Sequence, residues 1–261
     1  MSARRSACAG SATSLPPPAA CSLSLFFPLG EHFFIDSVRR HRELIAAGSP
    51  LDAAVAAFCR QEAFHSREHE AYNGALRPHM AVGAVEAVVG AVLAPFRAGP
   101  RCLALAGTAG LEHLTAVLGH TLLCDEALLA GSEPHYAALW RWHAYEETEH
   151  KAVAFDVYEA AYGRGVAAYT LRIAAYLIAM AIFFALFLPV FLYTCACAGC
   201  LLDGAGWRRL AHLQWAPPAP GAGALRRIVP LLFHYLRPGF HPWQHENSGL
   251  LRKGPARPPV E

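Results

Sequence analysis

Charged side chains are scarce in this chain of 261 residues, where they make up 16% of the sequence against 54% hydrophobic residues. The formal net charge is only +2 at pH 7, which is too small for nucleic-acid binding driven by electrostatics. We therefore expect no nucleic-acid partner. The positive mean hydropathy makes the chain apolar for a soluble enzyme.

Several common functional signatures are also missing. The eight cysteines form no disulfide framework, and Cys197-x-x-Cys200 has no second pair to complete a zinc site. This cysteine usage fits a reducing cytoplasmic compartment. The scattered glycines form no phosphate loop, and there is no nicotinamide, flavin or nucleotide motif. No alternating strand pattern competes with helical periodicity, so the sequence predicts an all-α fold.

Composition divides the chain into four predicted regions. Residues 1–23 are rich in Ser, Ala, Pro and Cys and indicate a disordered leader, because three consecutive prolines interrupt the position of a signal-peptide core. Residues 24–166 carry the helical core, residues 167–203 an apolar segment and residues 204–261 a tail. Helix-breaking residues divide the core into a helix around Glu31, helices over 50–73, 79–96 and 101–130, and a last helix that ends near Tyr162.

Two Glu-x-x-His pairs, Glu62/His65 and Glu147/His150, lie on different predicted helices. A three-residue step turns a helix by about 300°, so the two members of each pair share one face. One such pair alone would more often be an exposed polar face. Two pairs favour a metal site, because carboxylates and imidazoles buried together without metal lose hydration and repel one another.

A lone glutamate precedes each pair on its own helix, Glu31 before the first and Glu112 before the second. This order is what a ferritin-like four-helix bundle needs to hold two metal ions. His143 lies on the same face as Glu147 and offers a third imidazole. Mixed carboxylate and imidazole ligands suit iron or manganese. We expect two divalent ions, iron in the first place, with manganese or zinc as alternatives.

Neighbouring side chains leave some of these assignments open. His113 is an alternative to Glu112 as a metal ligand. Asp36 and Glu43, which lie on other faces of the helix, are alternatives to Glu31. His69 is expected behind the ligands rather than among them. Further polar residues are expected beside the site or at the surface: Glu68, Glu146, Glu149, His32 and His41.

Long motifs of this chain resemble, in the same order, a bacterial family of predicted metal-dependent hydrolases. The resemblance covers roughly residues 24–246 and is carried by Phe27-Pro28-x-Gly30-Glu31-x-Phe33-Phe34, Gln61-Glu62-Ala63-x-His65-x-x-Glu68-His69, Trp140-Arg141-Trp142-His143-x-x-Glu146-Glu147-x-Glu149-His150-Lys151-Ala152-Val153-Ala154-Phe155-Asp156 and Arg237-Pro238-Gly239-Phe240-His241-Pro242-Trp243. The leader before Leu25 departs from the family pattern.

The spacing of His143, Glu147 and His150 is also similar to that of di-iron arylamine N-oxygenases, whose additional histidine binds one iron. The resemblance implies the metal ligands Glu31, Glu62, His65, Glu112, His143, Glu147 and His150. Glu62 and Glu147, one from each Glu-x-x-His pair, are also the predicted catalytic carboxylates.

No charged residue lies between Arg172 and Asp203. As a helix this run would be about 45 Å long at ~1.5 Å per residue, which is enough to cross a hydrocarbon core of ~30 Å. Pro189 predicts a kink or a hairpin. We expect a membrane-associated or transmembrane segment with the metal domain on the cytoplasmic side, and a core helix or a homodimer-forming helix is the alternative.

The tail mixes aromatic and basic residues, as membrane-interface segments do: Trp207, Trp215, Arg226, Arg227, Tyr235, Arg237 and Trp243. Two further residues, His241 and His245, could reach back to the metal site.

Three functions fit these patterns. The favoured one is a membrane-associated di-iron enzyme that oxidises a hydrophobic or amine-bearing small molecule with dioxygen and an electron donor that the sequence does not identify. The second is hydrolysis by a metal-activated water. The third is a membrane protein that binds metal without catalysis.

Overall fold

In the computed structural model, which describes residues 17–129 and 132–252, the chain is helical and these residues contain no β-strand. The all-α prediction is confirmed. The helices are α1 (Pro18–Ser24), α2 (Phe27–Arg39), α3 (Pro50–Leu76), α4 (Val82–Ala98), α5 (Arg101–Cys124), α6 (Pro134–His150), α7 (Val153–Tyr162), α8 (Val166–Cys197), α9 (Gly204–Trp215), α10 (Ala224–His234) and α11 (Ser248–Leu251). Three short 3-10 turns are η1 (Arg42–Leu44), η2 (Glu126–Leu129) and η3 (Pro242–Gln244).

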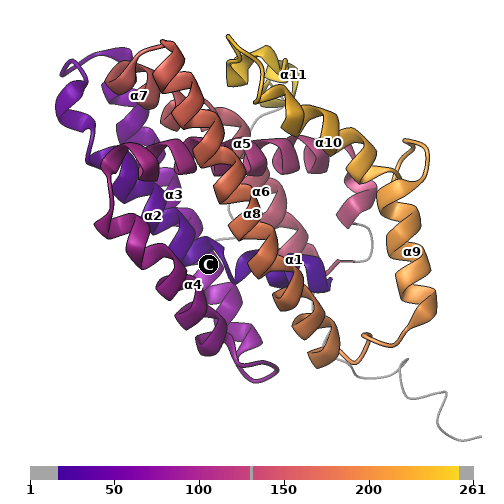
Figure 1. The fold of residues 1–261 in the computed structure, drawn as a ribbon. Coiled ribbons are helices and arrows are strands. Elements are labelled where there is room, and N and C mark those ends of the chain that lie inside the picture. Colours follow the sequence, from indigo (N-terminus) through magenta and orange to yellow (C-terminus); the bar gives the residue numbers. More distant parts are fainter. Residues whose placement is uncertain (1–16, 130–131, 253–261) are drawn as a thin grey trace, which may run out of the picture.

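Four of these helices enclose the interior of the protein (Figure 1). Helix α2 packs on α3, α3 on α6, α6 on α5 and α5 on α2, so that the four form a closed ring. Helix α4 covers α2, and α7 continues past α6 to pack against α3 and α5. This is a four-helix arrangement, while its ferritin-like kinship stays a prediction.

Local sequence signals explain where the ligand-bearing helices begin. The Ser49 hydroxyl accepts a hydrogen bond from the backbone N–H of Asp52, and Pro50 occupies the first turn of α3. Glu133 caps α6 in the same way, just before Pro134. A side-chain acceptor followed by proline is a strong helix start, because the acceptor satisfies an N–H that has no partner within the helix.

One predicted helix ends earlier than expected, and another is not continuous. The helix expected over residues 101–130 ends at Cys124, because Asp125 turns out of the helix and its carboxylate accepts hydrogen bonds from the Gly221 N–H and from Arg227. The last core helix, expected to be continuous to Tyr162, breaks between α6 and α7. At this break the buried Lys151 ammonium donates to the backbone carbonyl of His245 and to Asn247.

The end of the predicted leader is not disordered. Its last residues form α1, in which Cys21 and Ser22 are buried. The Ser22 and Thr194 hydroxyls lie 2.8 Å apart, which ties α1 to the far end of α8. An apolar anchor and buried polar contacts thus order this segment, while residues 1–16 lie outside the part of the chain that the structure describes.

Helix α8 is continuous through Pro189, so the hairpin alternative is wrong. Two helices, α5 and α8, are long and apolar enough to cross a membrane by length and composition. Helix α5 is mostly buried in the bundle, as a core helix is, whereas only 11% of the apolar window of α8 is buried. This is weak evidence for membrane association, and the cytoplasmic side stays a prediction.

Helix α5 approaches its neighbours closely at two glycines. A Cβ atom on Gly110 would lie 2.8 Å from Tyr176 Cδ2 and 3.2 Å from Tyr176 Cα on α8. A Cβ atom on Gly119 would lie 3.0 Å from the Ala144 carbonyl oxygen on α6. Because a backbone cannot move aside as a flexible side chain does, these glycines set the spacing of α5 from both helices.

We expect Gly110→Ala to lower the free energy of unfolding by about 1–3 kcal/mol, the usual effect of overpacking a close contact. The matched control is Gly107→Ala on the same helix, where an added Cβ meets nothing within 4 Å. This control should be neutral or raise the free energy of unfolding by about 0.5–1 kcal/mol, because alanine favours helix over glycine. Urea unfolding of both variants tests the pair, and equal effects would contradict the close approach.

Candidate metal centre

The four helices of the ring each direct predicted ligands into the interior. Glu31 comes from α2, Glu62 and His65 from α3, Glu112 from α5, and His143, Glu147 and His150 from α6. All seven side chains are buried, and none is more than 4% exposed. Six of them form two groups of three, and within each group the ligand atoms all lie within 4.8 Å of one another. These groups are two candidate metal sites.

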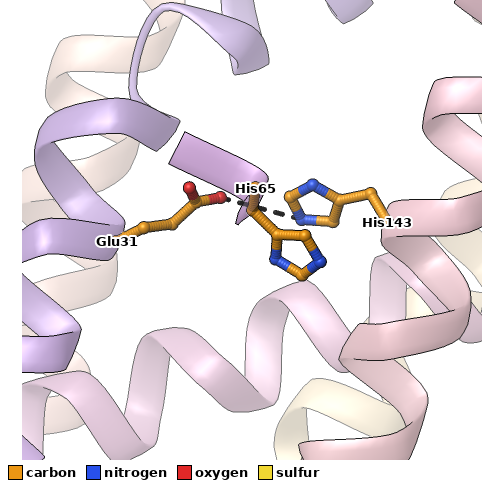
Figure 2. A group of neighbouring side chains, drawn as sticks. All are labelled: Glu31, His65 and His143. Atoms are coloured by element: carbon orange, nitrogen blue, oxygen red, sulfur yellow. Dashed lines mark ion pairs between the residues drawn. The ribbon is translucent and has the colours of Figure 1, made fainter. Parts of the chain in front are cut away.

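The first group consists of Glu31, His65 and His143 (Figure 2). Figure 2 shows the Glu31 carboxylate and the His143 ring facing each other from opposite helices, and Glu31 Oε1 lies 4.0 Å from His143 Nε2. The His65 and His143 rings stack with their centroids 4.1 Å apart. Two imidazoles and one carboxylate can hold an ion and leave other positions open.

The second group consists of Glu62, Glu147 and His150. His150 Nε2 lies 3.0 Å from Glu62 Oε1 and 3.7 Å from Glu147 Oε2. Glu112 lies outside both groups, but its Oε2 is 3.5 Å from the same nitrogen. This second candidate site is therefore richer in carboxylate than the first.

Glu62 and Glu147 belong to the second group and also contact histidines of the first. Glu147 Oε1 is 3.1 Å from His143 Nε2 and 3.7 Å from His65 Nδ1, although its other oxygen faces His150. Glu62 Oε1 also lies 3.8 Å from His65 Nδ1. A carboxylate with its two oxygens on two sites is suited to bridge two ions. The geometry therefore fits one dinuclear centre better than two separate sites.

Two of the three histidines have a hydrogen-bond partner at the nitrogen that faces away from the centre, and the third, His65, faces a carboxylate there without forming a hydrogen bond. His65 Nε2 lies 3.0 Å from Glu146 Oε2, and His150 Nδ1 lies 3.1 Å from the Gln61 Oε1 acceptor. The Gln61 amide in turn donates to Glu149. An acceptor at the outer nitrogen holds the proton there, so that the inner nitrogen keeps its lone pair for a metal.

His143 has a longer chain of partners. Its Nδ1 lies 2.9 Å from His69 Nε2, and His69 Nδ1 lies 2.9 Å from the Ser24 hydroxyl. Ser24 donates to Asn73 Oδ1, and the Asn73 amide donates back to the Ser24 carbonyl. His69 therefore lies behind the predicted ligands, as expected, and α1 contributes to the environment of the centre through Ser24.

The inward-facing atoms have no hydrogen-bond partner within the protein. They are Glu31 Oε1, both Glu62 oxygens, His65 Nδ1, Glu112 Oε2, His143 Nε2 and His150 Nε2. Buried polar atoms nearly always have a partner, because leaving one unpaired costs about 1–3 kcal/mol. Seven such atoms around one interior point fit a site for metal ions, which would accept all of their lone pairs.

The pKa values of these side chains also indicate that the buried charges are not balanced within the protein. Burial raises the pKa values of Glu31 and Glu112 well above the ordinary range, and repulsion from Glu62 adds to both. Burial also lowers the pKa of His65 well below its usual value. Against the effect of burial, contacts with His143 and His150 lower the pKa of Glu147, and contacts with Glu147 and Glu62 raise the pKa of His150.

The competing candidates lie elsewhere. His113 Nε2 lies 3.1 Å from the Leu231 carbonyl oxygen instead of in the centre, and Glu43 pairs with Arg101. Asp36 and His32 are exposed. The remaining candidates have partners outside the centre: His41 contacts Tyr162, Glu68 pairs with Arg67, His241 contacts Asp156, and His245 contacts His234.

Sequence reasoning missed several polar contacts of the centre. Ser66 donates to Glu31 Oε2, and the Thr115 hydroxyl donates to Glu147. Both lie one turn along a helix from a predicted ligand, Ser66 four residues after Glu62 and Thr115 three residues after Glu112, so helical spacing could have indicated them. Gln61 adjoins Glu62 within a quoted motif, while Ser24 could not be found without the fold.

We expect Glu62→Gln to abolish binding of at least one of two metal ions, because the amide loses the negative charge that would hold them. Metal analysis of purified protein checks this expectation. Glu70→Gln is the control, since Glu70 is an exposed glutamate on the same helix. Unchanged metal content in Glu62→Gln would remove α3 from the centre.

In metal-free protein, Glu112→Gln should raise the free energy of unfolding by about 1–3 kcal/mol at neutral pH, as removal of an unmatched buried group does. The pKa of Glu112 is raised in the folded state, so its carboxylate destabilises the fold only above the ordinary glutamate pKa of 4.5. The gain should therefore vanish near pH 4. Thermal unfolding with chelator across pH tests this, and a uniform loss of stability at every pH would contradict it.

Comparison with known proteins supports a role for metal. Residues 19–246 match the family model described as predicted metal-dependent hydrolase. No curated protein and no solved structure matches the chain. The matched region contains all seven predicted ligands and extends from α1 to beyond η3. By this match, the chain belongs to the family of predicted metal-dependent hydrolases.

Proposed function

We propose that the protein is a dinuclear metal-dependent enzyme that oxidises a small molecule with dioxygen. The observation that carries the proposal is the convergence of four carboxylates and three imidazoles at one buried point. Two bound ions, iron in the first place, would supply the binding and reduction of dioxygen. The protein residues hold the ions, exclude water and position protons.

The charge of the ligand set supports redox chemistry. Four carboxylates neutralise two divalent ions completely, and they favour any further positive charge that the ions gain on oxidation. A water bound to neutral clusters of this kind is acidified less than a water on a histidine-only zinc site, because the carboxylates already offset the charge of the metal. The ligand chemistry also suits iron or manganese.

Aromatic residues line the outside of the ligand set. The Phe27 ring centroid lies 4.6 Å from that of His143, the Trp142 centroid 4.9 Å from that of His65, and the Phe58 centroid 5.0 Å from that of His150. Such walls keep bulk water from the centre and favour an apolar substrate. They support the proposal that the substrate is hydrophobic or amine-bearing.

Glu146 provides a route for protons. Its side chain is 18% exposed, and it connects the His65 ring to the surface of α6. Burial raises the pKa of this carboxyl, while a hydrogen bond from the Trp142 indole opposes the shift. A partly exposed carboxyl with a raised pKa can exchange protons with water, and in its charged form its Oε2 faces His65 Nε2.

Hydrolysis is the second candidate, and the family description favours it over oxidation. In this alternative the Glu31, His65 and His143 group would hold a metal whose bound water attacks the substrate. Glu62 or Glu147 would then accept the proton of that water. Both proposals use the same residues, so the metal and the reaction must be tested together.

The test is to load metal-free protein with ferrous iron under anaerobic conditions, quantify the metal and then admit oxygen. We expect two irons per chain, consumption of dioxygen and a change in the optical spectrum on reoxidation. The Glu62→Gln variant is the control for iron bound outside the centre.

Hydrolysis predicts a different result. Zinc-loaded protein would cleave esters or amides, and the iron-loaded protein would not consume dioxygen above the Glu62→Gln control. That outcome would replace oxidation with hydrolysis, and stoichiometric metal with neither activity would contradict both.

A further inference from the structure

Helix α8 exposes a long face without charge. Arg172 is the only charged residue between Val166 and Cys197, and it is buried. At ~1.5 Å per residue the helix is about 48 Å long. Large apolar side chains on its outer face are between 36% and 80% exposed: Val166, Leu177, Ile178, Phe184, Leu188, Leu192 and Tyr193. An exposed apolar strip of this length marks an interaction surface.

The opposite face of α8 is fixed to the protein at both ends. Near its start, Arg172 donates to the Tyr235 carbonyl and Tyr176 donates to the Leu232 carbonyl. In its middle, the Phe183 and Phe187 rings pack on Phe26. Near its end, the buried Thr194 meets Ser22 of α1. Figure 1 shows α8 crossing the bundle along its full length.

These contacts oppose a transmembrane orientation. To cross a bilayer, α8 would either detach from the bundle and leave Arg172 without its carbonyl partners, or carry the attached bundle into the hydrocarbon. Tyr193 of α8 accepts a hydrogen bond from the backbone of Ala81, and the Arg77–Glu86 ion pair flanks that loop. Charged groups inside the hydrocarbon are strongly unfavourable.

Helices α9 and α10 follow α8 along the chain, lie to one side of it in the view of Figure 1, and carry exposed basic and aromatic residues. The Phe191 and Trp207 rings, 6.0 Å apart, connect α8 to α9, where Arg208 is exposed and Trp215 is 62% exposed. On α10, the exposed Arg226 lies on the same helix as Phe233, which is 64% exposed. Cationic and aromatic side chains beside an apolar surface match the headgroup layer of an anionic membrane.

We propose that α8 binds flat to a lipid bilayer that contains anionic phospholipids, with its outer face in the acyl boundary and the basic residues of α9 and α10 at the headgroups. The bundle takes the place of the polar face that an isolated interfacial helix would need. A second copy of the chain is the competing occupant of this surface, and it would not need the basic residues that an anionic membrane surface attracts. The proposal does not depend on the reaction at the metal centre.

The test uses full-length protein and flotation with phosphatidylcholine vesicles that contain a minority of phosphatidylserine. Leu177→Arg and Leu188→Arg should each lower the partition coefficient about tenfold or more, because each replaces an exposed leucine that the membrane would bury with a charged side chain. Leu44→Arg should have no effect, since Leu44 lies in η1 and is 55% exposed, as Leu188 is. Vesicles of phosphatidylcholine alone should bind the wild-type protein more weakly.

Orientation is tested by inserting a site-specific protease sequence in the turn before α8 or the turn after it. With protein bound to sealed vesicles, external protease should cut at both positions. Cutting at only one position would establish a spanning helix and overturn the flat orientation. The proposal would also be overturned if both leucine variants floated as the wild-type protein does. A wild-type dimer that Leu188→Arg dissociates without affecting flotation would overturn it as well. Metal content and unfolding temperature verify that every variant is folded.

Discussion

Four carboxylates and three imidazoles share one water-poor interior, and the rest of the bundle is organised around their mutual electrostatics. His150 faces Glu62 and Glu147, while burial, with repulsion from Glu62, raises the pKa values of Glu31 and Glu112. Such an interior is stable only if cations enter it or protons stay on it. The folded state thus bears the cost of burying these groups, and in it the predicted ligands already surround one interior point.

The surrounding contacts keep those ligands in place. The outer nitrogens of the three histidines face Glu146, His69 and Gln61, so each ring has a defined orientation and a preferred proton position. Close backbone approach at Gly119 brings α5 and α6 together, and these two helices carry Glu112 and the three ligands of the last motif. Oxidation and hydrolysis would both use this same rigid frame, and the choice between them depends on which metal the carboxylate-rich site retains.

Helical periodicity explains how much of this could be predicted from the sequence. The relation of Glu62 to His65, or of His143 to Glu147, is local, and the order of the helices follows from capping residues and prolines. Contacts between residues that are far apart in the sequence could not be predicted in this way. Ser24 directly follows the segment whose composition indicated disorder, and it contacts His69 only because α1 packs beside α3. Tyr235, expected at a membrane interface, is fully buried against Arg172.

The break between α6 and α7 has a consequence for how the protein is assembled. Lys151 directly follows His150, and its ammonium group is held by Asn247 and by the carbonyl of His245, about a hundred residues further along the chain. These contacts fix the residue directly after the predicted ligand His150 from a segment far along the chain, where α11 packs on α6. A nascent chain would contain all seven predicted ligands before Asn247 is made, so Lys151 is fixed only after that later segment has folded back.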